Sequence, residues 1–258
     1  MTTAVRERTS HARQAPRQRA RKNRGRQAMA LLADARVRLG LGAAGLLATA
    51  LPAHADRVGE YERRAFRAVN GLPDSLYVPA WMIMQLGTLG AAPAAACVAW
   101  LAGDRRLAWR MAVGGSATWA LSKAVKQKVR RPRPADLLAD TRRRGKDASG
   151  LGYLSGHAGV ATALGSAAFH RLGPRGRTIV VGLVPIVGLS RAYVGAHLPL
   201  DIAGGAALGL AVDAATALTQ RAVLDRPRTA LSITSVSSAG SCARRTSAPT
   251  SHDRGRRP

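Results

Sequence analysis

Apolar segments separated by short polar connections fill the middle of the chain. The longest, residues 75–103, contains no charged side chain. The other apolar runs are shorter: 39–53, 111–122, 148–169, 178–190 and 202–220. A helix needs about 20 mainly apolar residues to cross the hydrocarbon core of a bilayer. Because flanking Arg and Lys can extend the shorter runs by reaching the interface, the pattern predicts an all-α polytopic membrane bundle of about six transmembrane helices.

Small side chains are concentrated in these runs, as in GGSATWA, AGVATALGSAA and IAGGAALGLA. In a bilayer they allow helix backbones to approach closely, whereas glycine in the helix of a soluble protein only lowers stability. The composition therefore favours a membrane bundle. The alternative is a soluble all-α protein, because its buried helices would show a similar hydropathy.

Positive charge is concentrated at the two ends of the chain. The formal net charge is +26; residues 1–38 hold eleven Arg or Lys against two acidic residues, and residues 221–258 hold eight Arg against two. The two ends thus carry +9 and +6, more than half of the total, which argues against a nucleic-acid partner for the central part. We expect a basic disordered cytoplasmic tail over 1–38, a membrane domain over 39–220 and a Ser/Arg-rich disordered tail over 221–258.

The connections between the apolar runs indicate an orientation. With a cytoplasmic N-terminus and one crossing at each run, the basic connections 104–110 and 171–177 and the C-terminal tail lie in the cytoplasm, as the positive-inside rule requires. Trp100 and Trp109 flank the turn at 103–108, where an aromatic belt is expected. The sequence thus predicts an integral protein of the cell membrane with both termini in the cytoplasm. In the alternative, residues 39–55 are a signal peptide that ends in the cleavage motif AHA.

One connection departs from this charge distribution. Residues 123–147 would face the outside, yet they contain ten Lys or Arg against three Asp. A basic run of this kind is commonly a solvated loop or a lipid-headgroup patch. Here it includes KQKVRRPRP (126–134), and two more polar stretches, YLSGHAGV (153–160) and SRAYVGAHLPLD (190–201), are expected at the same ends of the helices. The departure therefore suggests a functional site on the extracytoplasmic side.

These three stretches carry groups that suit a phosphate ligand. Lys126, Arg133 and Arg191 supply cations, and the two guanidinium groups offer planar sets of donors to phosphate oxygens. Proline on both sides of Arg133 restricts the backbone there. Ser155 and Gly156 precede an apolar helix, so that a hydroxyl and free amides can point at the same anion. We therefore predict that these five residues bind phosphate.

Two of the six histidines begin apolar segments beside the predicted phosphate ligands. His197 precedes Asp201 by four residues, and a helix that starts at 198–199 would bring the carboxylate back to the imidazole. The carboxylate can then accept one ring N–H and raise the basicity of the other nitrogen, which attacks phosphorus. His157 can protonate the leaving oxygen and later activate water. Because fixed cations stabilise the developing charge, no metal and no cofactor is predicted, and no Cys/His spacing indicates zinc.

Three motifs resemble, in order and spacing, the signature of the type 2 phosphatidic acid phosphatase superfamily: Lys126-x6-Arg133-Pro134, Ser155-Gly156-His157 and Ser190-Arg191-x5-His197-x3-Asp201. That group includes lipid phosphate phosphatases, undecaprenyl-diphosphate phosphatases and, more distantly, vanadium-dependent haloperoxidases. The resemblance covers roughly residues 56–220. It implies a helical bundle, six spans in membrane members, and metal-independent hydrolysis of phosphate esters or anhydrides. It also implies that His197 is the nucleophile, that Asp201 orients it and that His157 is the acid; Leu154 stands where the family usually has proline.

Several functions are compatible with these motifs. The first is a membrane phosphatase, formed by 39–220, that hydrolyses an amphiphilic phosphate or diphosphate lipid at the extracytoplasmic face through a phosphohistidine. The alternatives are a vanadate-dependent haloperoxidase and a non-catalytic membrane protein on the same scaffold. The motifs select neither the lipid nor the oligomeric state. Asp213, inside the last apolar run, is expected to have a structural partner on another helix.

Overall fold

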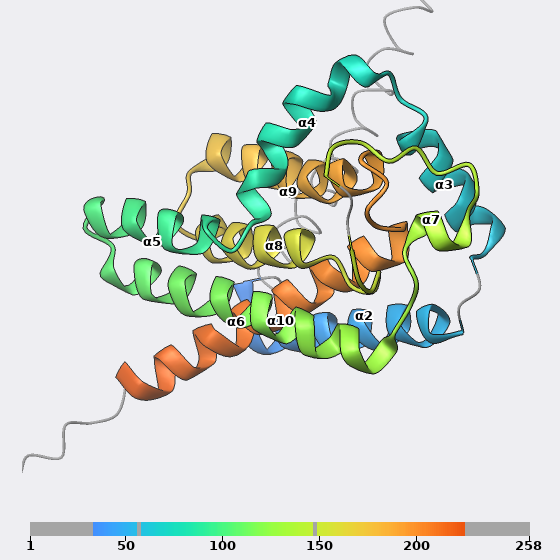
Figure 1. The fold of residues 1–258 in the computed structure, drawn as a ribbon. Coiled ribbons are helices and arrows are strands. Elements are labelled where there is room, and N and C mark those ends of the chain that lie inside the picture. Colours follow the sequence, from blue (N-terminus) through green and yellow to red (C-terminus); the bar gives the residue numbers. More distant parts are fainter. Residues whose placement is uncertain (1–32, 56–57, 147–148, 225–258) are drawn as a thin grey trace, which may run out of the picture. The chain divides into compact units, whose positions relative to one another are not determined.

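The regular secondary structure of the described residues is entirely helical. The computed structural model describes residues 33–55, 58–146 and 149–224, and these contain α-helices and short 3-10 helices but no strand (Figure 1). This confirms the all-α prediction. Nearly all of the two tails that we expected to be disordered, residues 1–32 and 225–258, lies outside the described residues.

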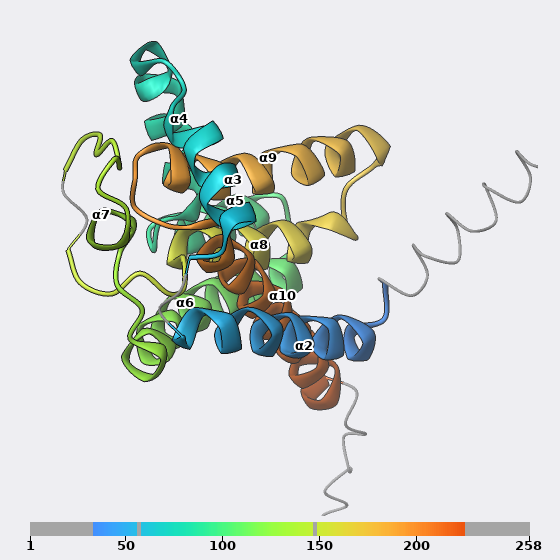
Figure 2. The same ribbon diagram turned by 90° about the vertical axis from the view of Figure 1, so that its right-hand side faces the viewer.

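One helix lies in the centre of the bundle. The bundle is formed mainly by α2 (Ala35–His54), α5 (Ala91–Leu101), α6 (Arg105–Val129), α8 (Gly156–Phe169), α9 (Pro174–Tyr193) and α10 (Pro199–Leu224). Helix α8 packs against α6, α9 and α10, while α2 runs along α10 and α5 pairs with α6 (Figures 1 and 2). Gly205 and Gly209 of α10 lie so close to the carbonyl groups of Ser155 and Gly159 that a Cβ at either glycine would overlap them. Small residues thus bring α8 and α10 into backbone contact.

The first and last helices extend beyond the apolar runs that predicted them. Helix α2 begins at Ala35, where the Asp34 carboxylate caps it by accepting the amide of Arg36 at 2.8 Å. Arg38, expected in the basic tail, is therefore part of the bundle and is only 3 % exposed. Helix α10 continues to Leu224, four residues past the expected end. Both extensions add charged turns to one end of the bundle.

The uncharged segment 75–103 forms two helices instead of one continuous crossing. It contains η1 (Asp74–Leu76), α4 (Tyr77–Met84), η2 (Gln85–Gly87) and α5. The two halves are bent by 70° at the break. Gly87 approaches the backbone of His157 there so closely that a Cβ would not fit. The bend therefore places α4 against α9, above the start of α8 (Figure 1).

Hydropathy identifies fewer membrane spans than the six predicted. Within the described residues, the helix over Pro199–Val223 is by itself long and apolar enough to cross a bilayer. The bent pair 74–101 passes the same test when it is taken as one span. The other long helices either carry charged turns at their ends or are short, as α8 is with 14 residues. The number six therefore stays a prediction.

Two helices appear where hydropathy predicted no element. They are α3 (Glu60–Asn70) and the single turn α7 (Pro134–Leu137). The buried amide of Asn70 donates to the carbonyl groups of Arg142, Ala192 and Tyr193, and its oxygen accepts the amide of Arg142 at 2.8 Å. Helix α3 thereby ties the loop after α7 to the end of α9.

Candidate active site

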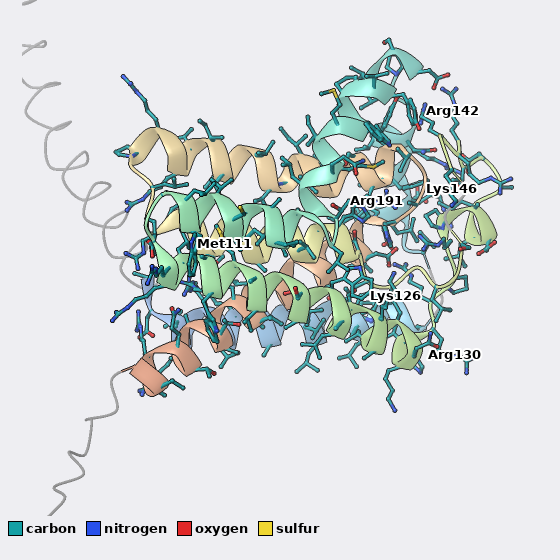
Figure 3. All side chains as sticks on the ribbon, turned by 60° about the vertical axis from the view of Figure 1, so that its left-hand side comes forward. Met111, Lys126, Arg130, Arg142, Lys146 and Arg191 are labelled. Atoms are coloured by element: carbon teal, nitrogen blue, oxygen red, sulfur yellow. The ribbon has the colours of Figure 1, made fainter. Side chains whose placement is uncertain are left out.

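The three sequence motifs converge at one end of the bundle. They contribute Lys126 at the end of α6, Arg133 before α7, Ser155, Gly156 and His157 at the start of α8, Arg191 at the end of α9, and His197 and Asp201 around the start of α10. Figure 3 shows Lys126 and Arg191 at this end, with Arg142 and Lys146 of the basic loop, while Met111 lies farther along the bundle. Residues up to 75 positions apart in the sequence are thus neighbours.

Hydrogen bonds to the backbone hold these stretches together. The amide of Ser155 donates to the carbonyl of Asp201 at 2.8 Å, and the amide of His197 donates to the carbonyl of Arg191 at 3.2 Å. The Arg133 guanidinium donates to the carbonyl of Ala196 at 2.7 Å. The segments that carry the two histidines and the cations are therefore fixed relative to one another.

His197 lies at the centre of the cations. Its ring is 3 % exposed. Burial is the main reason that its pKa lies well below the ordinary value of 6.5, and the positive charges of Lys126 and Arg191 lower it further. Arg133 and His157 act in the same direction, which shows that the predicted site residues surround this ring. His197 is therefore neutral near pH 7, the state in which a ring nitrogen can act as a nucleophile.

The predicted hydrogen bond between His197 and Asp201 is not formed. Nδ1 of His197 lies 3.7 Å from Oδ2 of Asp201, beyond hydrogen-bond length, and has no hydrogen-bond partner among the described residues. The carboxylate is engaged elsewhere: Oδ1 accepts from Arg131 at 2.9 Å and Oδ2 accepts the amide of Leu198 at 2.8 Å. Asp201 thus places a negative charge beside the ring without a direct hydrogen bond.

Two residues that were not predicted hold Asp201 in place. Arg131 is fully buried, and its guanidinium joins Asp201 to Glu62 of α3, with Nη2 2.7 Å from Oε2 of Glu62. Glu62 also accepts the amide of Leu200 at 3.0 Å. The neighbouring Arg130 ends α6 in a left-handed conformation (φ 56°), and its side chain points away from the bundle in Figure 3. The chain therefore turns between two adjacent arginines, one exposed and one buried.

A signal for Glu62 was present in the sequence. Glu62, Phe66 and Asn70 are spaced four residues apart and so share one face of α3. Phe66 and Asn70 are buried on that face. Nothing in the run KQKVRRPRP, by contrast, indicates that Arg131 is the arginine that turns inward.

Carbonyl groups of the loop before α8 accept hydrogen bonds from two of the three cations of the site. Arg133 donates to carbonyl groups of Ser149 and Gly150, at 2.9 Å in the shortest case, and Lys126 donates to those of Leu151 and Gly152. These acceptors are neutral. A phosphate anion would offer the same donors charge-assisted hydrogen bonds, which are shorter and stronger.

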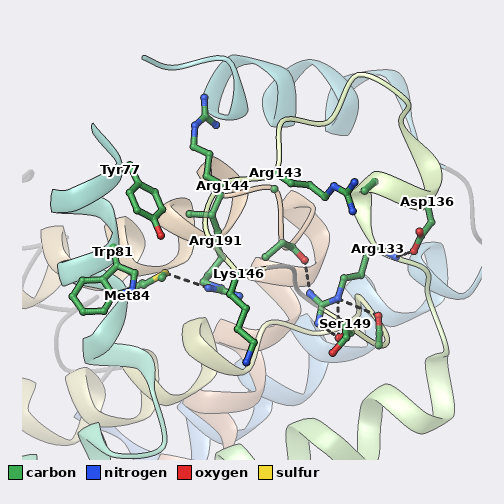
Figure 4. A pocket seen from close by; sticks show the side chains of 15 residues that line it. Tyr77, Trp81, Met84, Arg133, Asp136, Arg143, Arg144, Lys146, Ser149 and Arg191 are labelled. Atoms are coloured by element: carbon green, nitrogen blue, oxygen red, sulfur yellow. Dashed lines mark hydrogen bonds between the residues drawn. The ribbon is translucent and has the colours of Figure 1, made fainter. Parts of the chain in front are cut away.

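Arg191 is less completely satisfied. Its Nη1 donates to the Met84 sulfur at 3.2 Å, a weak acceptor, as the dashed line in Figure 4 shows. Its Nε is buried and has no hydrogen-bond partner among the described residues. A buried guanidinium in this state lacks an acceptor, which a ligand oxygen would supply.

The start of α8 adds backbone donors to the cations. Ser155 is fully buried and caps the helix, because its Oγ accepts the amide of Ala158 at 3.4 Å. The amides of Gly156 and His157 belong to the first turn, which has no acceptor within the helix. A helix N-terminus of this kind favours an anion. The structure therefore brings together all eight predicted site residues.

A polar cavity of about 340 Å³ opens beside this group (Figure 4). Arg133 and Arg191 line it together with Lys146 of the basic loop. Tyr77 and Trp81 of α4 form an aromatic side of the same cavity. Because α4 reaches the cavity only through the bend after Met84, the break in the uncharged segment is what closes this side of the site.

The dependence of protein stability on pH, below neutrality, tests whether His197 is neutral in the folded protein. Because its folded-state pKa is lowered, this ring stabilises the fold above pH 6.5, and that contribution is lost as the pH falls toward the folded-state pKa. The loss should approach about 1.4 kcal/mol per pH unit. Thermal unfolding of the full-length protein in detergent between about pH 5 and 7.5 measures it.

Two variants show how much of this pH dependence of stability comes from His197. His197→Asn should reduce the acid-side loss, part of which comes from His157, whose pKa is lowered to about 3 mainly by burial. His54→Asn, which alters an exposed ring at the end of α2, should leave the loss as it is in wild type. Wild type and His197→Asn declining in parallel would contradict a buried neutral ring.

Two solved structures share the fold. LpxE from Aquifex aeolicus matches with a TM-score of 0.55 and 20 % sequence identity, over 60 % of this chain and 93 % of the other. The first transmembrane PAP2 type phosphatidylglycerolphosphate phosphatase from Bacillus subtilis matches with a TM-score of 0.51 and 19 % identity, over 71 % and 96 %. No curated protein sequence matches the chain. At these identities the likeness establishes the fold, a helical bundle shared with PAP2-type phosphatases.

A family model matches part of the sequence. The model of the PAP2 superfamily matches residues 106–224, a range that contains all three motifs. This match is to the superfamily that the motifs resemble, and together with the fold it supports a phosphoric ester hydrolase.

Proposed function

We propose that this protein is an integral membrane phosphatase that hydrolyses a lipid phosphate or diphosphate at the extracytoplasmic face, without a metal and through a phosphohistidine. One observation carries the proposal: a buried, neutral His197 stands among Lys126, Arg133 and Arg191, beside the carboxylate of Asp201. A neutral imidazole is a nucleophile, and three cations bind and stabilise the phosphoryl group that it attacks.

The reaction takes two displacements at phosphorus. In the first, a ring nitrogen of His197 forms a bond to phosphorus and the bond to the lipid oxygen breaks. Burial and the charge of Arg191 lower the pKa of His157 to about 3 in the free protein, and the negative charge of the bound phosphate raises it, so that His157 carries the proton that it gives to the leaving oxygen. In the second, water attacks the phosphohistidine while His157 takes a proton from it, which releases inorganic phosphate and restores neutral His197. The carboxylate of Asp201, 3.7 Å from Nδ1, stabilises the positive charge that the ring carries in between.

Exposed apolar side chains support a membrane location. They lie along α2 (Leu41, Leu47, Leu51), α6 (Trp109, Val113, Leu121) and α9 (Ile179, Val181, Ile186, Leu189). Large apolar surfaces of this kind on a folded chain indicate contact with lipid or with another protein. For a chain whose solved neighbours include a transmembrane phosphatase, lipid is the natural partner.

The length of two helices supports the sidedness. Lys126 follows Arg106 by 20 residues in α6, and Arg221 follows Asp201 by 20 residues in α10. At 1.5 Å per residue both intervals measure about 30 Å, the thickness of the hydrocarbon core. The site and the basic opposite ends of these helices therefore match the two surfaces of one bilayer. The basic tails adjoin the end opposite the site, and their charge favours the cytoplasmic side for that end, which leaves the site outside.

An apolar groove next to the site supports an amphiphilic substrate. It measures about 590 Å³ and is lined by α5, α8 and α9. Gln85 and Thr88, at the break that contacts His157, line one end of it, and Val180 and Val184 of α9 line it farther along. A phosphate bound at the cations can thus leave its hydrocarbon chain in this groove.

Removal of divalent metal should not stop the reaction. Lys126, Arg133 and Arg191 supply the positive charge that metal ions supply in other phosphatases. With EDTA in excess, phosphate release by purified full-length protein should stay within about twofold of the untreated rate. Activity that disappears with EDTA and returns with Mg²⁺ would contradict this mechanism.

A substrate panel tests the proposed function as a whole. Full-length protein in detergent is assayed for phosphate release from phosphatidic acid, phosphatidylglycerol phosphate, a prenyl phosphate and a prenyl diphosphate. We expect release from at least one of them. Release from none, or bromide oxidation with added vanadate in its place, would contradict a lipid phosphatase.

A further inference from the structure

A second polar cavity lies at the opposite end of the bundle. It measures about 520 Å³ and five arginines line it: Arg38, Arg106, Arg110, Arg171 and Arg221. Along α6 it is about 30 Å from Lys126, so it is separate from the candidate active site. No acidic side chain lines this cavity within the described residues.

The buried carboxylate of Asp213 neutralises part of the positive charge of these arginines. Asp213, 1 % exposed, accepts both Nε and Nη2 of Arg110 at 2.7 Å and lies 3.4 Å from Arg38. Ser166 donates to the same carboxylate at 2.6 Å. This is the structural partner expected for Asp213, and it fixes two of the arginines on a rigid base. One carboxylate between two guanidinium groups leaves an excess of positive charge.

The remaining arginines add to that excess. Arg171 pairs with Asp104 at 3.4 Å on the surface. Arg106 and Arg221 make no ion pair with any described residue. The adjoining segments of sequence are cationic as well: residues 1–32 hold nine Arg or Lys against one Glu, and residues 225–258 hold seven Arg against two Asp. Because the adjoining segments are cationic, a negatively charged partner for these arginines is expected to be a ligand and not another part of the chain.

A buried donor in the cavity wall lacks an acceptor. Arg38 is 3 % exposed, and its Nη1 donates to Ser166 at 3.1 Å and contacts Nε2 of His170 at 3.0 Å. Its Nε is buried and has no hydrogen-bond partner among the described residues. A buried N–H without an acceptor is costly. An anion in the cavity would bring oxygen acceptors to this guanidinium.

We propose that this cavity binds the phosphate group of an anionic phospholipid, or a free phosphate of the same chemistry, at the membrane surface opposite the active site. Arginine forks match phosphate oxygens, and basic cavities between helices on the cytoplasmic side are suited to lipid headgroups. The depth of about 30 Å below the active site places the cavity at the level of the other leaflet's headgroups. Arg38 and Arg110, held by Asp213, form the base of the site, and Arg106 and Arg221 form its rim.

Native mass spectrometry of the full-length protein tests this site. Detergent micelles contain dioleoyl phosphatidylglycerol, dioleoyl phosphatidylcholine or soluble glycerol 3-phosphate as the probe. The protein should retain phosphatidylglycerol and not phosphatidylcholine. Retention of glycerol 3-phosphate as well supports a site for the phosphate group itself, and retention of the lipid alone supports a lipid site.

Variants at the rim decide whether the cavity is responsible. Arg106→Gln combined with Arg221→Gln removes two exposed side chains and should weaken phosphatidylglycerol retention by about tenfold or more. Arg175→Gln, an exposed arginine near the same end that does not line the cavity, should leave it unchanged. Equal retention in the double variant and wild type, or equal loss in Arg175→Gln, would overturn the proposal.

Two further measurements separate this site from catalysis. Arg191→Gln, at the active site, should leave phosphatidylglycerol retention unchanged. Phosphate release by the rim double variant should stay within about twofold of wild type, because the rim is about 30 Å from the reacting groups. Retention lost with Arg191→Gln would instead place the lipid in the active site and overturn the second site, whereas a wild type that releases no phosphate contradicts only the proposed function.

Discussion

Phosphate release by His197→Ala protein is expected to fall by about 10⁴-fold or more, on the scale seen when an enzyme loses its nucleophile. The substitution removes the atom that bonds to phosphorus while leaving Lys126, Arg133 and Arg191 to bind the substrate. The rate constant kcat should therefore fall with little change in KM. Steady-state release from the best substrate of the lipid panel measures both constants.

A matched histidine and a trapping experiment complete this test. His54→Ala changes an exposed ring at the end of α2 and should retain full activity. Wild-type protein quenched with base during turnover of substrate labelled in the phosphoryl group should carry acid-labile label, and His197→Ala protein should carry none. Turnover that persists in His197→Ala protein would remove this residue from the nucleophile's role.

Arg131→Met should lower the free energy of unfolding by about 3–5 kcal/mol, the usual effect of removing one partner from a buried ion pair. Arg131 is fully buried between Glu62 and Asp201, and methionine would leave both carboxylates buried without their counter-ion. Thermal unfolding of purified protein in detergent measures the loss. Activity should fall as well, because Asp201 would no longer be held beside His197.

The adjacent arginine provides the control. Arg130→Met changes an exposed side chain that ends α6 and should leave stability nearly unchanged. Adding Glu62→Gln to Arg131→Met removes one of the two stranded charges and should restore part of the lost stability. If Arg131→Met unfolds at the wild-type temperature, the buried network does not support the site.

Spacing in the sequence predicted the residues of the candidate site because the motifs lie at the ends of helices. The apolar runs placed each motif at a helix end, and hairpins between neighbouring helices bring alternate ends to one face. The closeness of His157 and His197 thus followed from the order of the runs. The hydrogen bond between His197 and Asp201 did not, because Arg131 and the amide of Leu198 compete for the same carboxylate.

Features that depend on contacts distant in sequence were not predictable in this way. At the 70° bend in 75–103, Gly87 contacts the backbone of His157, and hydropathy carries no information about that contact. The excess of positive charge in 123–147 was read as a departure from the positive-inside rule. Part of that charge is structural: Arg131 is buried, and Arg144 donates to the carbonyl groups of Asn70 and Tyr193.

The carbonyl groups of residues 149–152 have a consequence for the end of the catalytic cycle. Since they hold Lys126 and Arg133 when no substrate is bound, an arriving anion gains only the difference between its own hydrogen bonds and those it displaces. The same loop recaptures both cations when inorganic phosphate departs. Lys126 and Arg133 therefore keep hydrogen-bond partners when inorganic phosphate dissociates. A site that binds phosphate tightly can in this way still release its product.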